Sequence, residues 1–193
     1  WAFAGVVWAA ASYFTAANGK WTAVSGVEHV HKKQYKPKST KYGINYFGFS
    51  ENKDDPVQIV VGTTELCNNN CKSGDSHKLQ VRDPMGAMLP QIWNVSTAED
   101  HYVTAIQVCL NGKSDSAKKK IKGLKVWGSR LKADGTLVAD SSPNKEELNN
   151  CKEWQDKVSC PSGKIATGVR AHYVSDKVGF AGLALHCSSI KKL

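Results

Sequence analysis

The sequence predicts an all-β domain in which three similar units pack around one core, and three internal repeats are the main observation behind this prediction. Each repeat has a short apolar segment, a loop, and a second segment that starts with glycine and an apolar residue. The repeats span residues 25–48, 104–128 and 167–187, and tryptophans precede them at Trp8, Trp93 and Trp154. One such hairpin-like unit cannot bury its apolar face alone, so the three should share a core.

Alternation of apolar and polar residues supports the same fold class, because it is typical of strands with one buried face. We predict strands at residues 57–61, 102–108, 121–127, 165–171 and 180–186. Turn-forming pairs separate such segments: Asn18-Gly19, Asn111-Gly112, Asp134-Gly135 and Ser162-Gly163. A single segment, residues 144–152, is a short and polar candidate for a helix.

The chain is organised as one domain. It has 193 residues, of which 41% are hydrophobic and 22% charged, as in ordinary soluble globular proteins. Loop-forming clusters lie between the repeats, and no linker divides the chain. We therefore predict a single domain, residues 1–193, with units at approximately 1–62, 63–140 and 141–193.

The six cysteines are even in number, which indicates disulfides and a secreted, extracellular protein. They are Cys67, Cys71, Cys109, Cys151, Cys160 and Cys187, and six cysteines allow fifteen pairings. The repeat favours Cys160–Cys187, whose residues flank the two strands of the third unit. Cys67 and Cys71 are close enough to close a small loop, which leaves Cys109 for Cys151. Zinc is the alternative, but Cys67 and Cys71 have no matching second pair.

Two further features concern the extracellular prediction and the N-terminus. Asn94-Val95-Ser96 is a glycosylation sequon at Asn94. Residues 1–11 form the most apolar segment of the chain, and we expect a buried first strand there. The alternative is a membrane-inserting arm. Because the chain begins at Trp1, we expect a processed form.

The third unit has a characteristic pattern of residue types: Trp154, Cys160-Pro161, Gly163, Gly168, Gly182-Leu183-Ala184-Leu185 and Cys187. This pattern resembles the repeat of vitelline membrane outer layer proteins and, more loosely, that of jacalin-type lectins. The resemblance implies a β-prism, built from three Greek-key sheets with pseudo-threefold symmetry. The first two units resemble the pattern as degenerate copies.

The chain also departs from these families. The usual acidic, Thr-containing loop is replaced by residues 117–120 and 175–178. The jacalin-type sugar site uses an N-terminal glycine and a Gly-x-x-x-Asp loop, whereas this chain starts with Trp1. The resemblance therefore suggests glycan binding or glycan transfer as activities, but the fold is what we carry over from it.

Lysine-rich loops within the repeats are the strongest functional signal. The chain has a formal charge of +9, which favours acidic partners. If equivalent loops emerge at one end of the prism, they form one basic rim that attracts polyanions, with tyrosines that can stack on sugar rings. The candidate binding residues are Lys32, Lys33, Tyr35, Lys36, Lys38, Tyr42, Lys113, Lys118, Lys119 and Lys120. The alternative is that these lysines only keep the loops solvated.

Signals for catalysis or metal binding are weak. His29 and His31 share a face of a strand, which suits a metal pair, but no third ligand is evident, so we predict neither a metal nor a cofactor. The sequence lacks a serine-hydrolase, zinc-protease or phosphate-loop motif, and its carboxylates cannot be paired from sequence. No recognisable nucleic-acid-binding motif accompanies the charge.

We predict a secreted, non-catalytic protein that binds extracellular glycans or an acidic polysaccharide through the basic rim. An anionic membrane surface or a matrix protein is a further partner class. Three alternatives remain: a structural matrix, egg-coat or adhesive protein; a glycan-active transferase or hydrolase; and a membrane-active defence or venom protein.

Overall fold

The computed structural model describes residues 12–81 and 89–193. The apolar segment 1–11, including Trp8, lies outside the described residues. The described chain is almost entirely β-structure, with one short 3₁₀ helix, η1 (Ser116–Lys118). Among the described residues, no helix is long and apolar enough to span a bilayer.

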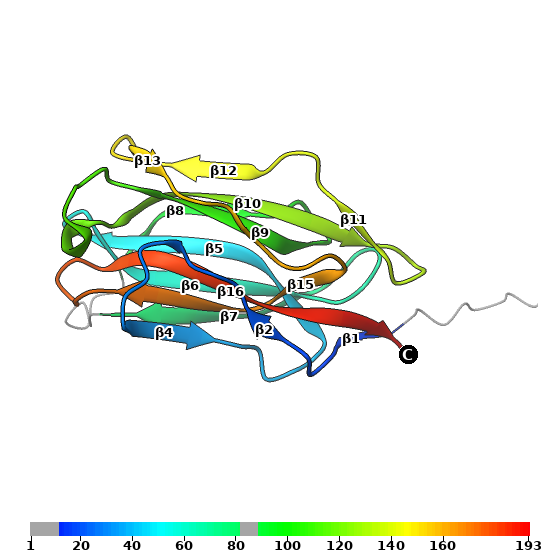
Figure 1. Cartoon of the computed structure of the whole chain (residues 1–193). Helices are drawn as coiled ribbons and strands as arrows, with labels where there is room; N and C mark the ends of the chain where they lie inside the picture. Colours follow the sequence, from blue (N-terminus) through cyan, green and yellow to red (C-terminus); the bar gives the residue numbers. More distant parts are fainter. Residues whose placement is uncertain (1–11, 82–88) are drawn as a thin grey trace, which may run out of the picture.

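Three sheets make up the fold (Figure 1). Sheet I contains β5 (Tyr42–Asn52), β6 (Asp55–Glu65), β7 (Ser73–Gln80) and β8 (Gln91–Ser96). Sheet II contains β9 (His101–Leu110), β10 (Ile121–Leu131), β11 (Leu137–Ala139), β12 (Asn144–Glu147), β13 (Glu153–Trp154) and β14 (Val158–Ser159). Sheet III contains β15 (Lys164–Tyr173) and β16 (Phe180–Lys192) together with β1 (Tyr13–Thr15), β2 (Lys20–Trp21), β3 (Ser25–Gly26) and β4 (His31–Tyr35).

Each sheet has the Greek-key order. In sheet I the order is β7-β6-β5-β8, so a central hairpin is flanked by the third strand on one side and by the returning fourth strand on the other. Sheet II follows the same order around β9 and β10. In sheet III the hairpin β15–β16 comes from the C-terminus, and β1 to β4 from the N-terminus supply its flanking strands. The predicted three-sheet β-prism is thereby confirmed.

The sheets do not follow the predicted unit limits. The limit at 62/63 falls inside β6, and the limit at 140/141 separates β11 from β12 within sheet II. The first predicted repeat is also not a hairpin, because Ser25 pairs with Leu183 of β16 whereas Gly43 belongs to sheet I. The physical reason is that residues 13–35 supply the flanking strands of the last sheet.

The predicted helix at 144–152 is wrong. Residues 144–147 form β12, an exposed edge strand paired with β10 from Asn144↔Val126 to Glu147↔Gly123. Short polar edge strands carry no hydrophobic periodicity, so the sequence pattern could not distinguish them from a polar helix.

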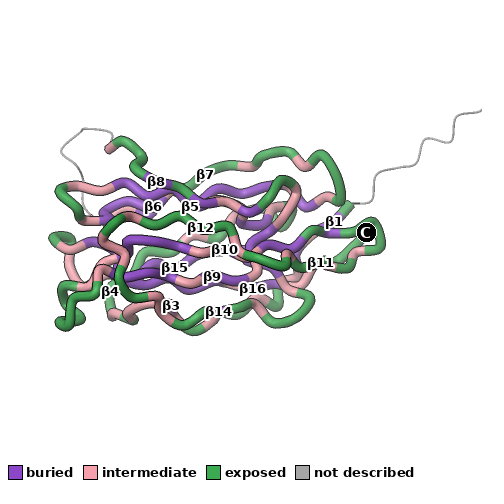
Figure 2. The backbone as a smooth tube through the Cα atoms, turned by 90° about the horizontal axis from the view of Figure 1, so that it is seen from above, coloured by how far each residue is buried: buried purple, intermediate pink, exposed green. Residues whose placement is uncertain are grey.

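One continuous core joins the three sheets. Its fully buried side chains include Phe47 from sheet I, Ile106 and Leu124 from sheet II, and Val169 and Leu183 from sheet III. Figure 2 shows the buried segments running along the central strands, while the outer strands and loops are exposed. The shared core explains why no single repeat needs to be stable by itself.

The three predicted disulfides are confirmed. Cys67–Cys71 closes a short loop after β6, Cys109–Cys151 ties β9 to the segment after β12, and Cys160–Cys187 ties the segment after β14 to β16. All six cysteines are therefore bonded.

The loops of the three central hairpins lie at one end of the molecule, on the left in Figure 1, which we call the hairpin end. They are the β5–β6 turn (53–54), the β9–β10 loop (111–120) and the β15–β16 loop (174–179).

Candidate functional site

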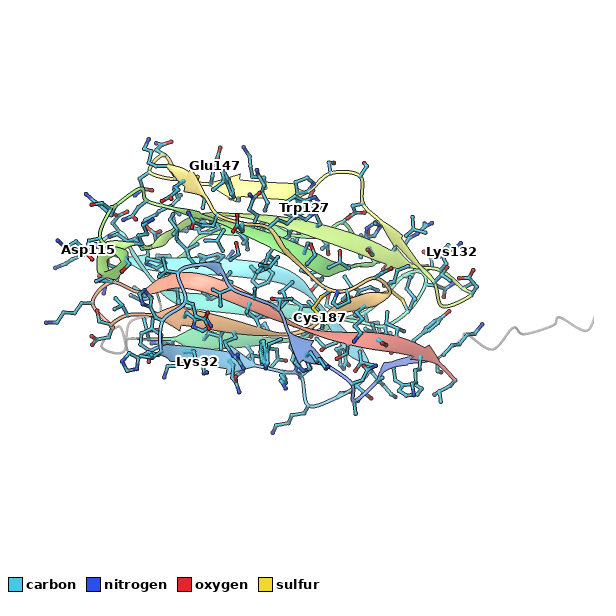
Figure 3. The ribbon with its side chains drawn as sticks, in the orientation of Figure 1. Lys32, Asp115, Trp127, Lys132, Glu147 and Cys187 are labelled. Atoms are coloured by element: carbon cyan, nitrogen blue, oxygen red, sulfur yellow. A yellow bond between two sulfur atoms is a disulfide. The ribbon has the colours of Figure 1, made fainter. Side chains whose placement is uncertain are left out.

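The structure spreads the predicted basic residues along the prism: Lys32 and Lys33 pair with the last residues of β15, near the hairpin end, whereas Lys36 and Lys38 follow β4 away from it. Lys113, Lys118, Lys119 and Lys120 lie in the β9–β10 loop at the hairpin end. The other predicted loop contains strand β4, which pairs with β15 from His31↔Tyr173 to Tyr35↔Val169 and so carries the chain along the prism. As a result, the segment after Tyr35 lies toward the opposite end, where the carbonyl of Thr40 accepts a hydrogen bond from Thr15. Figure 3 shows the two ends, marked by Asp115 and Lys132.

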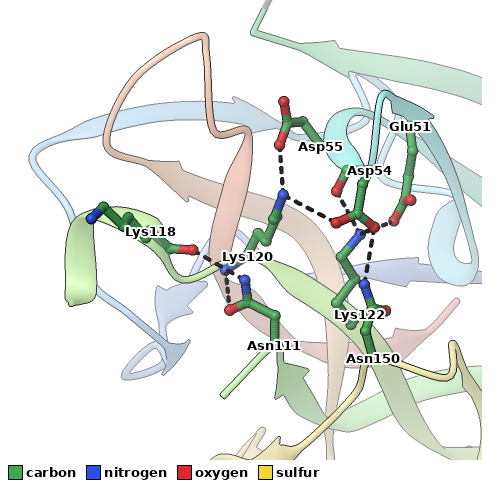
Figure 4. Close-up of polar contacts among 8 residues, drawn as sticks. All are labelled: Glu51, Asp54, Asp55, Asn111, Lys118, Lys120, Lys122 and Asn150. Carbon is green, nitrogen blue, oxygen red and sulfur yellow. Dashed lines mark hydrogen bonds and ion pairs between the residues drawn. The ribbon is translucent and has the colours of Figure 1, made fainter. Parts of the chain in front are cut away.

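The lysines at the hairpin end are largely neutralised by carboxylates. Lys119 lies 2.8 Å from Glu153, and exposed Lys118 lies 3.6 Å from Asp115. Lys120 lies 2.8 Å from Asp55 (Figure 4). Burial alone would lower the pKa of Lys120, but its contacts with the aspartates outweigh burial and raise it. Lys113 is exposed, and no ion pair to it is found in the described part of the chain.

A groove lies where the edges of sheets I and III meet, and three of the predicted site residues line it. We call it the tyrosine groove. Its volume is about 560 Å³, and it is lined by Tyr35, Pro37, Lys38, Ser39, Tyr42, Thr63, Asp75, Ser76 and His77. This volume lies within the range of small-molecule sites, roughly 300–1,000 Å³.

Strands β4 and β7 form one wall of the tyrosine groove. The Tyr35 ring packs against the edge of the core and stacks on His77, with ring centroids 4.5 Å apart and an angle of 8° between the planes. Burial raises the pKa of the Tyr35 hydroxyl, and the nearby Asp75 carboxylate raises it further. The phenol therefore stays protonated and able to donate a hydrogen bond at neutral pH.

The first residues of β5 and β7 form the other wall. Tyr42 lies over Gly74, where an added Cβ would come within 2.6 Å of the Tyr42 ring and 2.4 Å of the Thr63 hydroxyl. The Thr63 hydroxyl donates to the Asp75 carbonyl over 2.8 Å, which fixes the backbone of the acidic residue. The Asp75 side chain thus stands at the groove with a fixed main chain and an exposed carboxylate.

A smaller hollow of about 110 Å³ adjoins this groove and shares Pro37, Ser39 and Tyr42 with it. It reaches His186, whose Nδ1 lies 2.9 Å from the Thr167 hydroxyl. Burial lowers the pKa of His186, and the positive charge of Lys36 lowers it further. The loop between β4 and β5, residues 36–41, therefore has hydrogen-bonding groups on both of its sides.

The remaining predicted residues of this loop lie outside the groove. Lys32 and Lys33 point into solvent from β4, and Lys36 Nζ lies 5.4 Å from the Trp21 ring centre. Thr63, Asp75, Ser76 and His77 also line the groove but were not predicted from the sequence. The last three lie on β7, a polar edge strand whose sequence carries little strand signal.

Metal binding finds little support in the described residues. The group with metal-like spacing there is Cys67, Cys71 and Asp100, but its two sulfurs are bonded to each other. The Asp100 carboxylate accepts hydrogen bonds from the backbone of Asn70 and Cys71. The two histidines considered from sequence form no group of three or more possible ligands with a carboxylate or cysteine among the described residues. His31 stacks on Tyr173, while the His29 carbonyl lies 2.7 Å from His172 Nδ1.

Comparison with known proteins gives structural likenesses alone. No family model and no curated protein matches the sequence. Calsepa lectin in complex with a biantennary N-glycan is similar, with a TM-score of 0.52 and 9% identity over 89% of this chain and 97% of that chain. Calystegia sepium agglutinin has a TM-score of 0.49 and 10% identity over 89% and 97% of the two chains. Single-chain recombinant jacalin has a TM-score of 0.42 and 11% identity over 90% and 96%. The first likeness shows the fold, a β-prism of the kind found in jacalin-type lectins.

Proposed function

We propose that this chain is a non-catalytic glycan-binding protein and that the tyrosine groove is its sugar site. The observation that carries the proposal is the convergence of two tyrosine rings, one carboxylate and several hydroxyls in a groove of about 560 Å³. Sugar rings have an apolar C–H face and a rim of hydroxyls. A site for them therefore needs aromatic contact area and fixed hydrogen-bonding groups together.

Each side chain then has a specific role. The ring of Tyr42 supplies a surface against which the apolar face of a sugar can pack. The Asp75 carboxylate accepts hydrogen bonds from two neighbouring sugar hydroxyls, and charged acceptors make the stronger bonds. Ser39, Ser76 and the Tyr35 hydroxyl complete the polar lining.

The same lining favours binding over catalysis. Hydrolysis of a glycosidic bond ordinarily uses two carboxyl groups on either side of the bond. Asp75 is the one carboxylate among the described residues that line the tyrosine groove. A glycan-active enzyme is therefore the weaker interpretation.

The predicted role for the lysines becomes a secondary part of this proposal. Lys38 lines the tyrosine groove, and exposed Lys32, Lys33 and Lys36 lie on or beside β4. We propose that they attract glycans with carboxylate or sulfate groups, an effect that weakens with salt. Lys113, Lys118, Lys119 and Lys120 lie at the hairpin end and take no part in this groove.

An extracellular location agrees with this function. Three disulfides persist in oxidising compartments. Asn94 is exposed on β8, so a glycan can be attached there without disturbing the core. The Calsepa lectin structure, which shares the fold, holds a biantennary N-glycan, and this supports glycan binding as the function of the prism. A structural role in a matrix is compatible with the same binding activity.

A glycan array followed by calorimetric titration tests the proposal. We expect wild-type protein to bind a defined sugar and Asp75→Asn to bind it at least about tenfold more weakly, because a charged acceptor is lost. Asp176→Asn is the matched control, since Asp176 is an exposed aspartate in the β15–β16 loop at the hairpin end. Unchanged affinity of Asp75→Asn, or no binding to any glycan, would overturn this function.

A further inference from the structure

A second surface, at the junction of sheets II and III, has the features of a binding site and is distinct from the tyrosine groove. It is built on residues 157–164, which we call the lysine ridge. Two hollows lie on either side of the ridge, with volumes of about 270 and 310 Å³. Lys157, Ser159, Pro161 and Lys164 line both hollows.

The lysine ridge is held rigidly. Its strand β14 pairs with β9, and the Cys160 amide donates to the Thr104 carbonyl over 2.7 Å. The Cys160–Cys187 disulfide ties the ridge to β16, and a turn closes it with a hydrogen bond from the Lys164 amide to the Pro161 carbonyl. A ligand that binds here therefore meets a surface whose backbone needs no ordering, which reduces the entropic cost of binding.

The positive charge of this surface is not neutralised within the molecule. Lys20 is opposite Cys187 in the pairing of β2 with β16, so it lies next to the disulfide that anchors the ridge. Lys20, Lys157 and Lys164 all line the 310 Å³ hollow. Within residues 12–81 and 89–193, none of these three has a carboxylate within ion-pair distance, in contrast to Lys118, Lys119 and Lys120 at the hairpin end.

One acid does line the other hollow, but its carboxylate is already engaged. Asp140 lies 2.7 Å from His101 Nδ1 through one oxygen and accepts a hydrogen bond from the Gly128 amide through the other. The surface therefore presents unpaired cations and no competing free carboxylate among the described lining residues.

Indole rings border the ridge on both sides. Trp127 lines the 270 Å³ hollow, and Lys157 Nζ lies 4.0 Å above its ring centre. Trp21 lines the other hollow, and its ring carries the Arg170 guanidinium at 4.0 Å. Such cation–π contacts hold the charged groups in place beside the rings. An anion can then pair with Lys157 while a sugar packs beside the half-buried indole of Trp127.

We propose that the lysine ridge binds a segment of a sulfated or carboxylated polysaccharide. Two hollows separated by a cationic ridge fit neighbouring rings of a linear chain, with its acidic substituents on the lysines. The shape and the aromatic walls favour sugar rings, and the unpaired lysines require an acidic polymer. This inference does not rest on the tyrosine groove, because the two surfaces lie on different junctions of sheet III and share no lining residue.

The test compares two variants that each remove two positive charges. Lys157→Ala with Lys164→Ala alters the ridge, whereas Lys113→Ala with Lys177→Ala alters two exposed lysines at the hairpin end. Heparin is the sulfated probe, dextran the uncharged probe, and phosphatidylserine vesicles the lipid probe. Calorimetric affinities are measured at low and high salt, and tryptophan fluorescence reports whether the surroundings of the indole rings change on binding.

We expect the ridge variant to bind heparin about tenfold more weakly than wild type, with a smaller salt dependence, and the hairpin-end variant to bind almost as wild type. Heparin should also change the tryptophan fluorescence of wild type. Equal losses in the two variants would show attraction to overall charge and would overturn the proposal. It would equally be overturned if only vesicles or only dextran bound, or if none of the three probes did.

Failure here is distinguishable from failure of the proposed function. The sugar identified for the tyrosine groove is titrated into the same ridge variant, which should bind it with unchanged affinity. Conversely, Asp75→Asn should bind heparin as wild type does.

Discussion

Lys122 provides the sharpest test of how the prism is held together, because its ammonium group is buried among counter-ions at the hairpin end (Figure 4). Its side chain is 0% exposed, and Nζ lies 2.8 Å from Glu51 and 2.6 Å from Asp54 Oδ1. It also donates to the Asp54 carbonyl. These contacts link β10 of sheet II to the β5–β6 turn of sheet I.

The loss of stability on removing the Lys122 charge depends on which carboxylate would then remain buried without a partner. Glu51 is only 6% exposed, whereas Asp54 is 54% exposed and keeps contacts with Lys120 at 3.3 Å and Asn150 at 2.9 Å. Burial would raise the pKa of Asp54, but its contacts with Lys122, Asn150 and Lys120 together outweigh burial and lower it. Lys122→Met therefore leaves the Glu51 carboxylate buried without a counter-ion. Removal of one partner from a buried ion pair lowers the free energy of unfolding by about 3–5 kcal/mol.

Urea unfolding with intact disulfides, followed by tryptophan fluorescence, measures this cost. We expect Lys122→Met to lose about 3–5 kcal/mol, and Lys122→Met combined with Glu51→Gln to regain about 2 kcal/mol, since no buried charge then remains unpaired. The control is Lys132→Met at the opposite end, where the pair with Asp134 is exposed and screened by solvent, so the stability should stay close to that of wild type. A loss below about 1 kcal/mol for Lys122→Met, or a double variant less stable than the single one, would refute the reasoning.

Two further predictions concern pH. Burial raises the pKa of Tyr102 to about 12, so the folded protein keeps this proton where the unfolded chain loses it. The stability is fully present below pH 10 and falls between about pH 10 and 12, by up to roughly 2–3 kcal/mol. Tyr102→Phe should flatten this slope in urea midpoints measured at alkaline pH, and an unchanged slope would contradict the assignment. At the acidic side, burial lowers the pKa of His29, with a further contribution from His172, and burial also lowers the pKa of His186. Unfolded imidazoles protonate first, so stability should fall as the pH drops below about 6.5. His29→Gln combined with His186→Gln should reduce that fall in thermal melts across this range, whereas an equal fall in wild type and variant would rule it out.

The β5–β6 turn, which Lys122 contacts, also explains why the β5–β6 hairpin was not predicted from the sequence. Residues Lys53 and Asp54 have φ values of 49° and 73°, as both central residues of a tight two-residue hairpin turn do. In sequences, such turns are usually recognised by Asn-Gly or Gly-Gly pairs. Here the buried ammonium of Lys122, distant in sequence, stabilises the turn instead, so no local pattern marks it.

Local patterns were sufficient where burial alternates along a strand and where a turn contains glycine. The predicted segments 102–108, 121–127, 165–171 and 180–186 all lie within β9, β10, β15 and β16. Local sequence patterns did not predict strands whose pairing depends on contacts distant in sequence. The pairing of Ser25 with Leu183 joins the two ends of the chain, and β7 consists largely of exposed polar residues with no apolar face of its own. Asp75 and His77 could not be placed in the tyrosine groove for that second reason.

The lysines show why a count of charges does not locate a binding site. The β9–β10 loop has the densest lysine cluster in the sequence, and this density favoured it as part of a basic rim. Carboxylates from Asp55 and Glu153 approach these lysines only after the chain folds, and they cancel the charge there. The lysines of residues 157–164 are spaced apart in sequence and gave no such signal, yet folding leaves them unpaired beside Trp127 and Trp21. An acidic ligand responds to the field that remains after internal pairing, so the sparser lysines on the junctions of sheet III are the ones we expect to determine what this protein binds.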